Sequence, residues 1–214
     1  FYTKYKYYEE TEDRGYDSAQ STTNTIDDGW EMNQYGMRVD WEINERETLT
    51  LQGDFFVNNY FDSSQDAHGG NVVVSYNNNH EDGSNTGVKF FYNGYDIESD
   101  STSQDLDTYD LDIQHRFNVG AHEITIGGGG RTTRGRFENK SATTTIHSST
   151  YQFVNLYLQD KITLTEEFSI TPGIKMEYNS YTGFEAMPSL RAVYAPDENH
   201  TFWASISKAV RTPS

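Results

Sequence analysis

Residues 35–57 hold the pattern that most restricts the fold: two runs in which apolar and polar residues alternate, separated by a polar break at 44–47. Successive side chains of a β-strand point to opposite faces, so each run has one apolar and one polar face. The apolar set is Tyr35, Met37, Val39, Trp41 and Ile43 in the first run and Leu49, Leu51, Phe55 and Val57 in the second. The two runs therefore predict a β-hairpin with a single apolar face.

The same alternation recurs along the rest of the chain and predicts eleven antiparallel strands joined in sequence order. The expected strands cover 1–10, 35–43, 48–57, 71–80, 86–97, 108–119, 123–138, 151–164, 168–179, 188–194 and 201–210. Among the connections, 82–85 contains Asp-Gly, a strong hairpin signal. The fold class is therefore all-β, with an up-and-down order of strands.

The connections alternate in length, which separates two kinds of β architecture. One set is short, at 44–47, 82–85, 120–122, 166–167 and 196–200, and the other set is mostly long, with 11–30 the longest. A soluble sandwich has no reason to place all its short turns at one end. A transmembrane β-barrel does, and strands near ten residues long match what a tilted strand needs to cross a bilayer. The pattern predicts a segment of a transmembrane β-barrel.

The composition agrees with a wall that is apolar on one face only. Apolar residues are 34% of the chain and the mean hydropathy is −0.81, which is lean for a globular core. Aromatic residues reach 14%, too many for a disordered acidic chain. The net charge of −17 argues against a nucleic-acid partner, whose phosphates need a basic surface. The chain has no Cys, which excludes disulfides and thiolate metal sites.

Closure of such a barrel requires more strands than this sequence contains. Single-chain bacterial barrels have an even number of strands, whereas eleven are expected here. An open sheet edge in lipid would leave backbone hydrogen-bonding groups without partners, at several kcal/mol each. We therefore expect the remaining strands to lie outside this sequence.

Several segments resemble the barrel of TonB-dependent outer-membrane receptors. The most specific is 203–214, Trp-Ala-Ser-Ile-Ser-Lys-Ala-Val-Arg-Thr-Pro-Ser, and weaker similarities cover 40–41, 49–54, 110–117, 181–185 and 188–191. The resemblance implies a barrel of about 22 strands, closed by a plug domain, in the outer membrane of a Gram-negative bacterium. Residues 1–214 would be a partial barrel domain, without the plug or the C-terminal strands.

The function implied by the resemblance is uptake of a scarce nutrient, energised by TonB through the plug. A ferric siderophore is the most frequent cargo in the family, and cobalamin, haem or a glycan are other possibilities. Family receptors bind cargo with external loops and the upper lumen wall. The candidate contacts are Tyr16, Trp30, Tyr60, Phe61, Tyr95, Arg131, Tyr181 and Phe184. The alternative for the aromatic ones is a girdle at the level of the lipid headgroups.

Three arginines near the end of one expected strand divide between its two faces. If Ile124 and Ile126 face lipid, Arg131 faces the lumen, whereas Arg134 and Arg136 share the lipid-facing parity. They lie about ten residues beyond Ile124, a rise of roughly 33 Å along the strand. This height predicts that Arg134 and Arg136 emerge at the outer rim and pair with lipopolysaccharide phosphates.

Acidic side chains allow two further interpretations. Glu12, Asp13, Asp27 and Asp28 could hold Ca²⁺, although no twelve-residue calcium-loop pattern is present and a solvated loop explains them as well. Lumen carboxylates at Asp40, Asp54, Asp110 and Asp112 are expected to pair with Arg38 and Arg116 on neighbouring strands. No metal site and no cofactor is expected.

Two other classes of protein compete with the receptor. An outer-membrane barrel enzyme could use Asp66 and His68, but no nucleophile or second acidic pair accompanies them at a recognisable spacing, so no catalytic residue is expected. A soluble β-sheet binding module is the other alternative. It would stay monodisperse without detergent, whereas a membrane wall would not.

Overall fold

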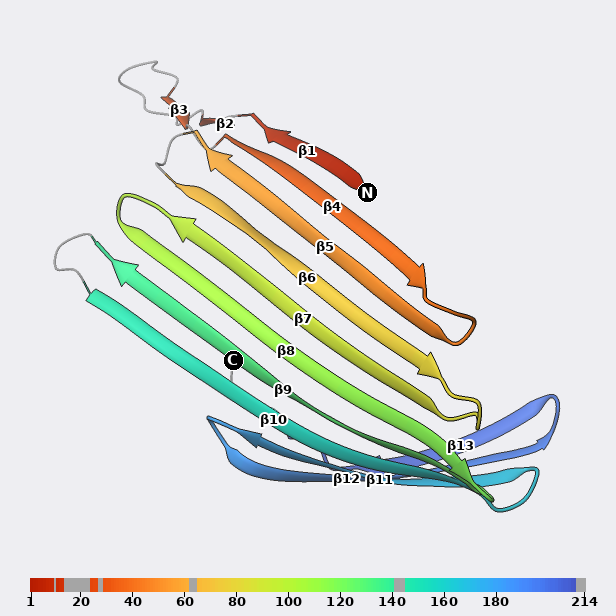
Figure 1. Cartoon of the computed structure of the whole chain (residues 1–214). Coiled ribbons are helices and arrows are strands. Elements are labelled where there is room, and N and C mark those ends of the chain that lie inside the picture. Colours follow the sequence, from red (N-terminus) through yellow and green to blue (C-terminus); the bar gives the residue numbers. More distant parts are fainter. Residues whose placement is uncertain (10, 14–23, 27–28, 62–64, 141–144, 211–214) are drawn as a thin grey trace.

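The computed structural model describes residues 1–9, 11–13, 24–26, 29–61, 65–140 and 145–210, and all regular structure in them is β. Eleven strands form one antiparallel sheet, and two short strands pair only with each other (Figure 1). The sheet contains β1 (Tyr2–Tyr8), β4 (Trp30–Glu42), β5 (Glu47–Tyr60), β6 (Asp66–Asn79), β7 (Asn85–Glu98), β8 (Thr102–Val119), β9 (His122–Asn139), β10 (Thr145–Thr163), β11 (Phe168–Asn179), β12 (Gly183–Asp197) and β13 (His200–Ser207). The separate pair is β2 (Thr11–Asp13) and β3 (Asn24–Ile26).

The order of strands in the sheet follows the order in the chain, which confirms the predicted up-and-down arrangement of eleven strands. Several boundaries differ from the prediction: β4, β8, β10 and β12 begin five or six residues earlier, at Trp30, Thr102, Thr145 and Gly183. Residues 66–70 were expected in a connection but belong to β6, because they pair with β5 on one side and with β7 on the other. Residues 11–30 were expected to form a loop throughout, yet they contain β2 and β3. Pairing with neighbours thus extends strands through Gly69 and Gly70, which sequence patterns treat as breakers.

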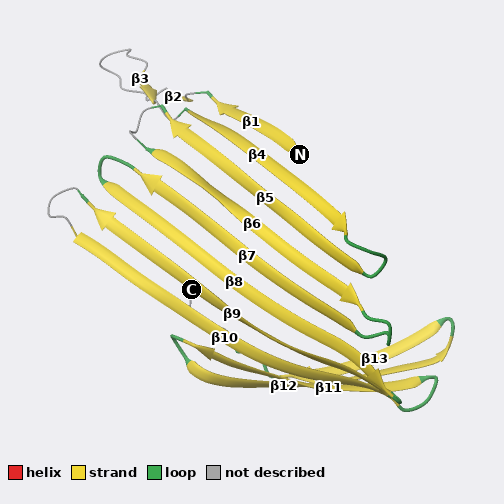
Figure 2. Ribbon diagram, viewed as in Figure 1, coloured by secondary structure: helices red, strands yellow, loops and turns green. Residues whose placement is uncertain are grey.

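The sheet is twisted and curved, as Figure 2 shows by the way β11, β12 and β13 turn away from the plane of the strands before them. The first strand, β1, pairs only with β4, and the last, β13, pairs only with β12. The described residues therefore form an open sheet rather than a closed barrel.

Register aligns the apolar side chains into rows that cross the sheet. One row runs through directly paired positions on eight strands: Trp41, Leu49, Tyr76, Val88, Ile113, Gly128, Leu156 and Met176. We call the side of the sheet that carries this row the apolar face and the opposite side the polar face. The hairpin at 35–57 thus sets a division between faces that holds from β4 to β11.

The apolar face is exposed and has no second layer packed against it. Ala67 is the one apolar residue that is buried within the described part of the chain. The exposed fraction is 59% for Trp41, 60% for Val154 and 73% for Ile206. In water such a surface would be strongly unfavourable, since each Å² of buried apolar area contributes about 25 cal/mol. Within the described ranges, no helix is both long and apolar enough to pass through a membrane.

The two ends of the sheet differ in their connections. One end carries the tight turns that join β4 to β5, β6 to β7, β8 to β9, β10 to β11 and β12 to β13 (Figure 1). Gly83 and Gly120 lie in two of these turns with φ of 79° and 59°, a backbone region that favours glycine. The connections at the other end include the longest one, between β1 and β4. The connections 99–101 and 180–182 at that end are as short as the turns opposite. We call it the external end, because the long connections of outer-membrane barrels are external.

Candidate functional site: the polar face and the external end

Ion pairs and hydrogen bonds cover the polar face. Arg38 binds both carboxylate oxygens of Asp40, with Nε to Oδ2 at 2.8 Å, and Thr50 donates to the same carboxylate. Asp110 pairs with Arg131, its direct partner across β8 and β9, at 2.8 Å between Nε and Oδ2. The sequence had predicted Arg116 as a partner for these carboxylates. Register decides otherwise, because Arg116 lies opposite Asn85 and Thr125.

A depression of about 700 Å³ lies on this face near the middle of β7 to β11. Its lining combines cations, carboxylates and aromatic rings: Lys89, Phe91, Asp110, Asp112, Arg131, Phe153, Asn155, Tyr157 and Lys175. The ammonium of Lys175 lies 5.3 Å from the centre of the Phe153 ring and 3.2 Å from Glu177. The wall here offers charged groups of both signs beside exposed aromatic surface.

The candidate contacts that the structure describes divide between the two faces. Trp30, Tyr60, Tyr95 and Arg131 have the parity of the polar face, whereas Phe184 lies on the apolar face and Phe61 packs on Tyr7, also of that face. Trp30 stacks on Tyr8, and the hydroxyl of Tyr95 accepts a hydrogen bond from Gln104. Tyr16 lies outside the described residues. Four candidates therefore share the polar face, on β4, β5, β7 and β9, whereas Phe61 and Phe184 lie on the other face.

Tyr181 lies in the external turn between β11 and β12 and stacks on Tyr151 of β10, with ring centres 5.1 Å apart. Tyr151 shares the parity of Phe153, so the stack belongs to the polar face. Sequence reasoning missed Tyr151, Phe153 and Lys175. For Tyr151 and Phe153 the signal is the alternation along 151–164, because residues of opposite parity to Val154, Leu156 and Leu158 must lie on the other face.

The apolar face has the height of a membrane core. On β8 the apolar set runs from Tyr109 to Val119, ten residues apart, which is about 33 Å along the strand. At a tilt near 45° this corresponds to about 23 Å of height, close to the ~25 Å apolar band of outer-membrane barrels. Charged residues begin immediately above Tyr109 on the same face.

These charged residues form a belt at the external end of the strands. Their positions have the same parity as the apolar side chains, so they lie on the same side of the sheet. Arg134 lies directly opposite Asp107 and Arg136 directly opposite Asp105, while Arg136 also contacts Glu138 at 3.3 Å. Next to the belt, Lys140 lies just beyond the end of β9 and binds Glu98 at 2.9 Å. The hydrogen bond that Lys140 donates to Glu98 raises the pKa of Lys140 above its ordinary value. Both arginines therefore lie among carboxylates on the apolar-face side of the sheet.

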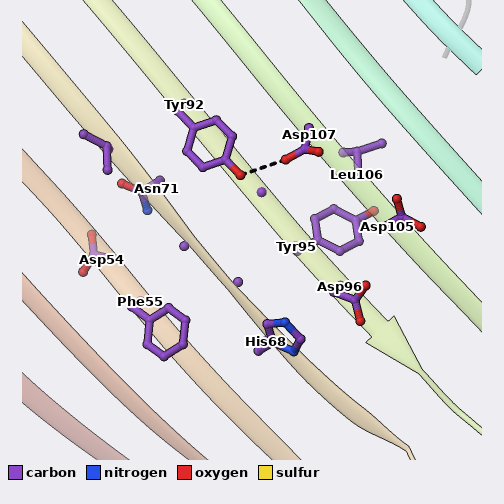
Figure 3. A pocket seen from close by; sticks show the side chains of 14 residues that line it. Asp54, Phe55, His68, Asn71, Tyr92, Tyr95, Asp96, Asp105, Leu106 and Asp107 are labelled. Carbon is purple, nitrogen blue, oxygen red and sulfur yellow. Dashed lines mark hydrogen bonds between the residues drawn. The ribbon is translucent and has the colours of Figure 1, made fainter.

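A second depression, of about 510 Å³, lies beside this belt (Figure 3). Gly70 and Gly94 are paired across β6 and β7 in its lining, and the Tyr92 side chain lies where a Cβ of Gly94 would stand. Around them lie Phe55, His68, Tyr92, Asp96, Asp105 and Asp107, with a hydrogen bond of 2.7 Å from the Tyr92 hydroxyl to Asp107. No group of three or more His, Asp or Glu side chains in the described ranges could hold a metal ion.

The candidate calcium ligands receive no test from the structure. Asp27 and Asp28 lie outside the described residues, and Glu12 and Asp13 are described only as the backbone of β2. Asp66 and His68, the pair considered for an enzyme, both lie on β6 with the parity of the apolar face. On this side of the sheet, Asp66 and His68 do not lie on the polar face where a lumen site would be.

A curved antiparallel sheet with an exposed apolar band of membrane height and a hydrated polar face is the wall of a transmembrane β-barrel. The family model "TonB dependent receptor-like, beta-barrel" matches residues 1–214. The chain belongs to this family, whose members are outer-membrane receptors of Gram-negative bacteria and not enzymes. The apolar face therefore contacts lipid and the polar face lines the lumen. This excludes the two alternative classes, an outer-membrane barrel enzyme and a soluble β-sheet binding module.

Solved structures share the fold at low sequence identity. The siderophore receptor PirA from Pseudomonas aeruginosa superposes with a TM-score of 0.71 at 18% identity, over 87% of this chain and 34% of that one. A mutant of the ferric enterobactin receptor PfeA from the same organism gives 0.68 at 14% identity, over 95% and 36%. The ferripyoverdine receptor of that outer membrane gives 0.67 at 13%, over 83% and 35%. Among curated proteins no sequence matches. The chain spans about a third of the length of these receptors.

Proposed function

We propose that this chain is part of the barrel wall of a receptor that takes up a ferric siderophore with energy supplied through TonB. The wall would be completed by further strands and a plug domain. The observation that supports a ferric siderophore as the cargo is the similarity in fold to receptors for a siderophore, ferric enterobactin or ferripyoverdine. Trp30, Tyr60, Tyr95, Arg131 and Tyr181 are the proposed contacts with cargo or with loops that hold it.

Chemistry on the polar face supports an anionic cargo that carries apolar or aromatic groups. The exposed fractions of the Arg131 and Lys175 side chains are 51% and 42%, so both cations can reach a ligand while they keep a carboxylate partner. Phe153 lies between them, directly opposite Arg131 and beneath Lys175. Charge-assisted hydrogen bonds and aromatic contact are available at one place on the wall.

The test of this function is growth on single iron sources. A strain that lacks the complete receptor should fail to grow on at least one ferric siderophore and should recover when the gene is restored. Replacement of Arg131 by Ala should reduce uptake of that siderophore, whereas Arg116→Ala, near the periplasmic end of the same face, should not. Normal growth of the deleted strain on every ferric siderophore, with a defect on cobalamin, haem or a glycan instead, would contradict the cargo.

We also propose that Arg134 and Arg136 bind lipopolysaccharide phosphates at the outer rim. The support is their position above the apolar band, in reach of the headgroups of the outer leaflet. The double variant Arg134→Ala/Arg136→Ala should retain less co-purified lipopolysaccharide than the unaltered receptor. Arg131→Ala, on the same strand but on the lumen face, is the matched control. Unchanged co-purification by the double variant would remove this proposal.

A further inference from the structure

The turn between β11 and β12 is organised around a fully buried polar side chain. Asn179 is 1% exposed, and both ends of its amide are bonded. Its Oδ1 accepts hydrogen bonds from the backbone N–H groups of Tyr181 and Thr182, at 3.0 and 2.8 Å. Its Nδ2 donates to the hydroxyl of Thr182 at 2.8 Å and to Glu177 at 3.3 Å. Burial of an amide is unfavourable unless it is bonded in this way, so the contacts hold the turn in one shape.

Two further features tie the turn to the neighbouring strand. The N–H of Ser180 donates to the carbonyl of Gln152 on β10, at 3.1 Å, and the N–H of Gln152 donates to the Ser180 hydroxyl, at 3.0 Å. Gly183 then starts β12 with φ of 77°, where a side chain would be strained. The turn is therefore attached to β10 at the residue that follows Tyr151.

This anchoring fixes the ring of Tyr181. One face of the ring lies against Tyr151, with centres 5.1 Å apart and planes inclined by 23°. Tyr181 is nevertheless 64% exposed, so its other face is open to solvent. An aromatic ring that is held in place and bare on one face is suited to stack on a second planar ring, because little side-chain entropy is left to lose.

We propose that Asn179 is a positioning residue that holds Tyr181 on Tyr151 as a platform for planar aromatic rings of the cargo. This assignment rests on the proposed function, since it concerns which siderophores the receptor prefers. It selects chelators whose iron-binding groups are aromatic, such as catecholates. Chelators that bind iron through groups without rings, such as hydroxamates, gain nothing from the platform.

The experiment compares two probes on the complete receptor that carries this chain: the ferric complex of a tricatecholate and the ferric complex of a linear trihydroxamate. Tyr181→Ala should weaken the tricatecholate about three- to tenfold, the range of an aromatic pair. It should leave any trihydroxamate affinity unchanged. Tyr181→Phe keeps the ring and should bind as the unaltered receptor does. Tyr178→Ala, on the apolar face close to the same turn, is the matched control.

A double-mutant cycle with Tyr181 tests the role of Asn179. Asn179→Ala should weaken the tricatecholate by a similar factor, and the double variant should be no weaker than Tyr181→Ala alone, because both changes remove one platform. Additive losses, or equal losses for both probes, would show that Asn179 acts only on general stability and would overturn the assignment. If Asn179→Ala failed to fold, the Tyr181 variants would still decide whether the platform binds rings.

The outcomes separate this assignment from the proposed function. If the unaltered receptor bound the trihydroxamate and not the tricatecholate, siderophore uptake would stand and the aromatic platform would fall. An unchanged tricatecholate affinity in Tyr181→Ala would have the same meaning. If neither ferric complex bound, the assignment would fall, and growth on single iron sources would still decide the proposed function.

Discussion

The phenol ring of Tyr157 lies across Gly127 on the neighbouring strand, and its hydroxyl donates to Gln114 one strand further, at 3.0 Å. A single side chain thus spans β10, β9 and β8 on the lumen face. Tyr2 repeats the arrangement over β1, β4 and β5, where its ring covers Gly36 and its hydroxyl bonds to Asp54. In both cases glycine is required because the tyrosine ring occupies the space of its side chain.

Substitution of Gly127 by Ala should therefore destabilise the wall. The added Cβ would clash with Cζ and the hydroxyl oxygen of Tyr157 and would lie 2.7 Å from the carbonyl oxygen of Ile113. Overpacking of this kind typically costs about 1–3 kcal/mol. Gly87→Ala is the matched control, since a Cβ there meets nothing within 4 Å. Thermal unfolding in detergent measures both, and equal melting temperatures for the two variants would contradict the steric account.

The hydroxyl of Tyr157 should contribute separately from its ring. Tyr157→Phe keeps the cover over Gly127 and removes the bond to Gln114, which we expect to cost about 0.5–1.5 kcal/mol. Tyr157→Ala should cost more, because it also exposes the glycine. In a double-mutant cycle with Gln114→Ala, the loss from Tyr157→Phe should disappear. An undiminished loss in the Gln114→Ala background would assign the effect to something other than this hydrogen bond.

The two faces should respond oppositely to the same charged residue. Val74→Arg places a cation on the apolar face, between Leu51 and Phe90, and should destabilise insertion by about 2–4 kcal/mol. Ser75→Arg, one residue further and facing the lumen, should be tolerated. Equilibrium folding into lipid vesicles measures the difference. Comparable losses for both variants would mean that the apolar face does not contact lipid.

The periplasmic turn between β6 and β7 should lose stability in acid. Asp82 accepts a hydrogen bond from the N–H of Ser84 at 2.9 Å, and bonds from Ser84 hold the pKa of this carboxyl below its usual value. A lowered pKa in the folded state means that the stabilisation is complete above the ordinary Asp pKa of about 4 and is lost as pH falls below it.

Comparison of variants across pH tests this turn. The difference in melting temperature between the unaltered chain and Asp82→Ala should be constant at neutral pH and should shrink as pH falls through about 4. Asp82→Asn keeps an acceptor that does not titrate, so its difference from Asp82→Ala should not depend on pH. If the advantage of Asp82 grew in acid, the sign of this argument would be wrong.

Alternation along the chain was sufficient to predict the faces but not the partners. Parity put Asp110 and Arg131 on the lumen side, and the structure pairs them directly. The sequence could not select Arg131 over Arg116, because partners depend on the register between strands and a shift of two residues leaves every face unchanged. Strand ends were uncertain for the same reason, as the inclusion of Gly69 and Gly70 in β6 shows.

The face on which a candidate side chain lies could be predicted within strands, from the alternation of residues. It could not be predicted for residues in turns. Tyr95 and Arg131 could be placed on the lumen side from their own strands. The position of Tyr181 depends on hydrogen bonds made by Asn179 and Ser180, which tie the turn to β11 and β10 and have no periodic signal in the sequence. Phe61 and Phe184 look equally suitable in sequence, yet their parity directs them to the other face.

Each strand of the sheet pairs with the sheet strand that precedes it in the chain. Nearly all contacts between residues distant in sequence therefore lie within a single hairpin. The conformational entropy lost when each loop closes is then small, and topologies dominated by local pairing fold fast. The wall can grow one strand at a time from an existing edge, with each new strand needing only to find the last one laid down. Between β1 and β4 the chain also forms β2 and β3, so the pairing of β1 with β4 closes the longest loop within the described sheet.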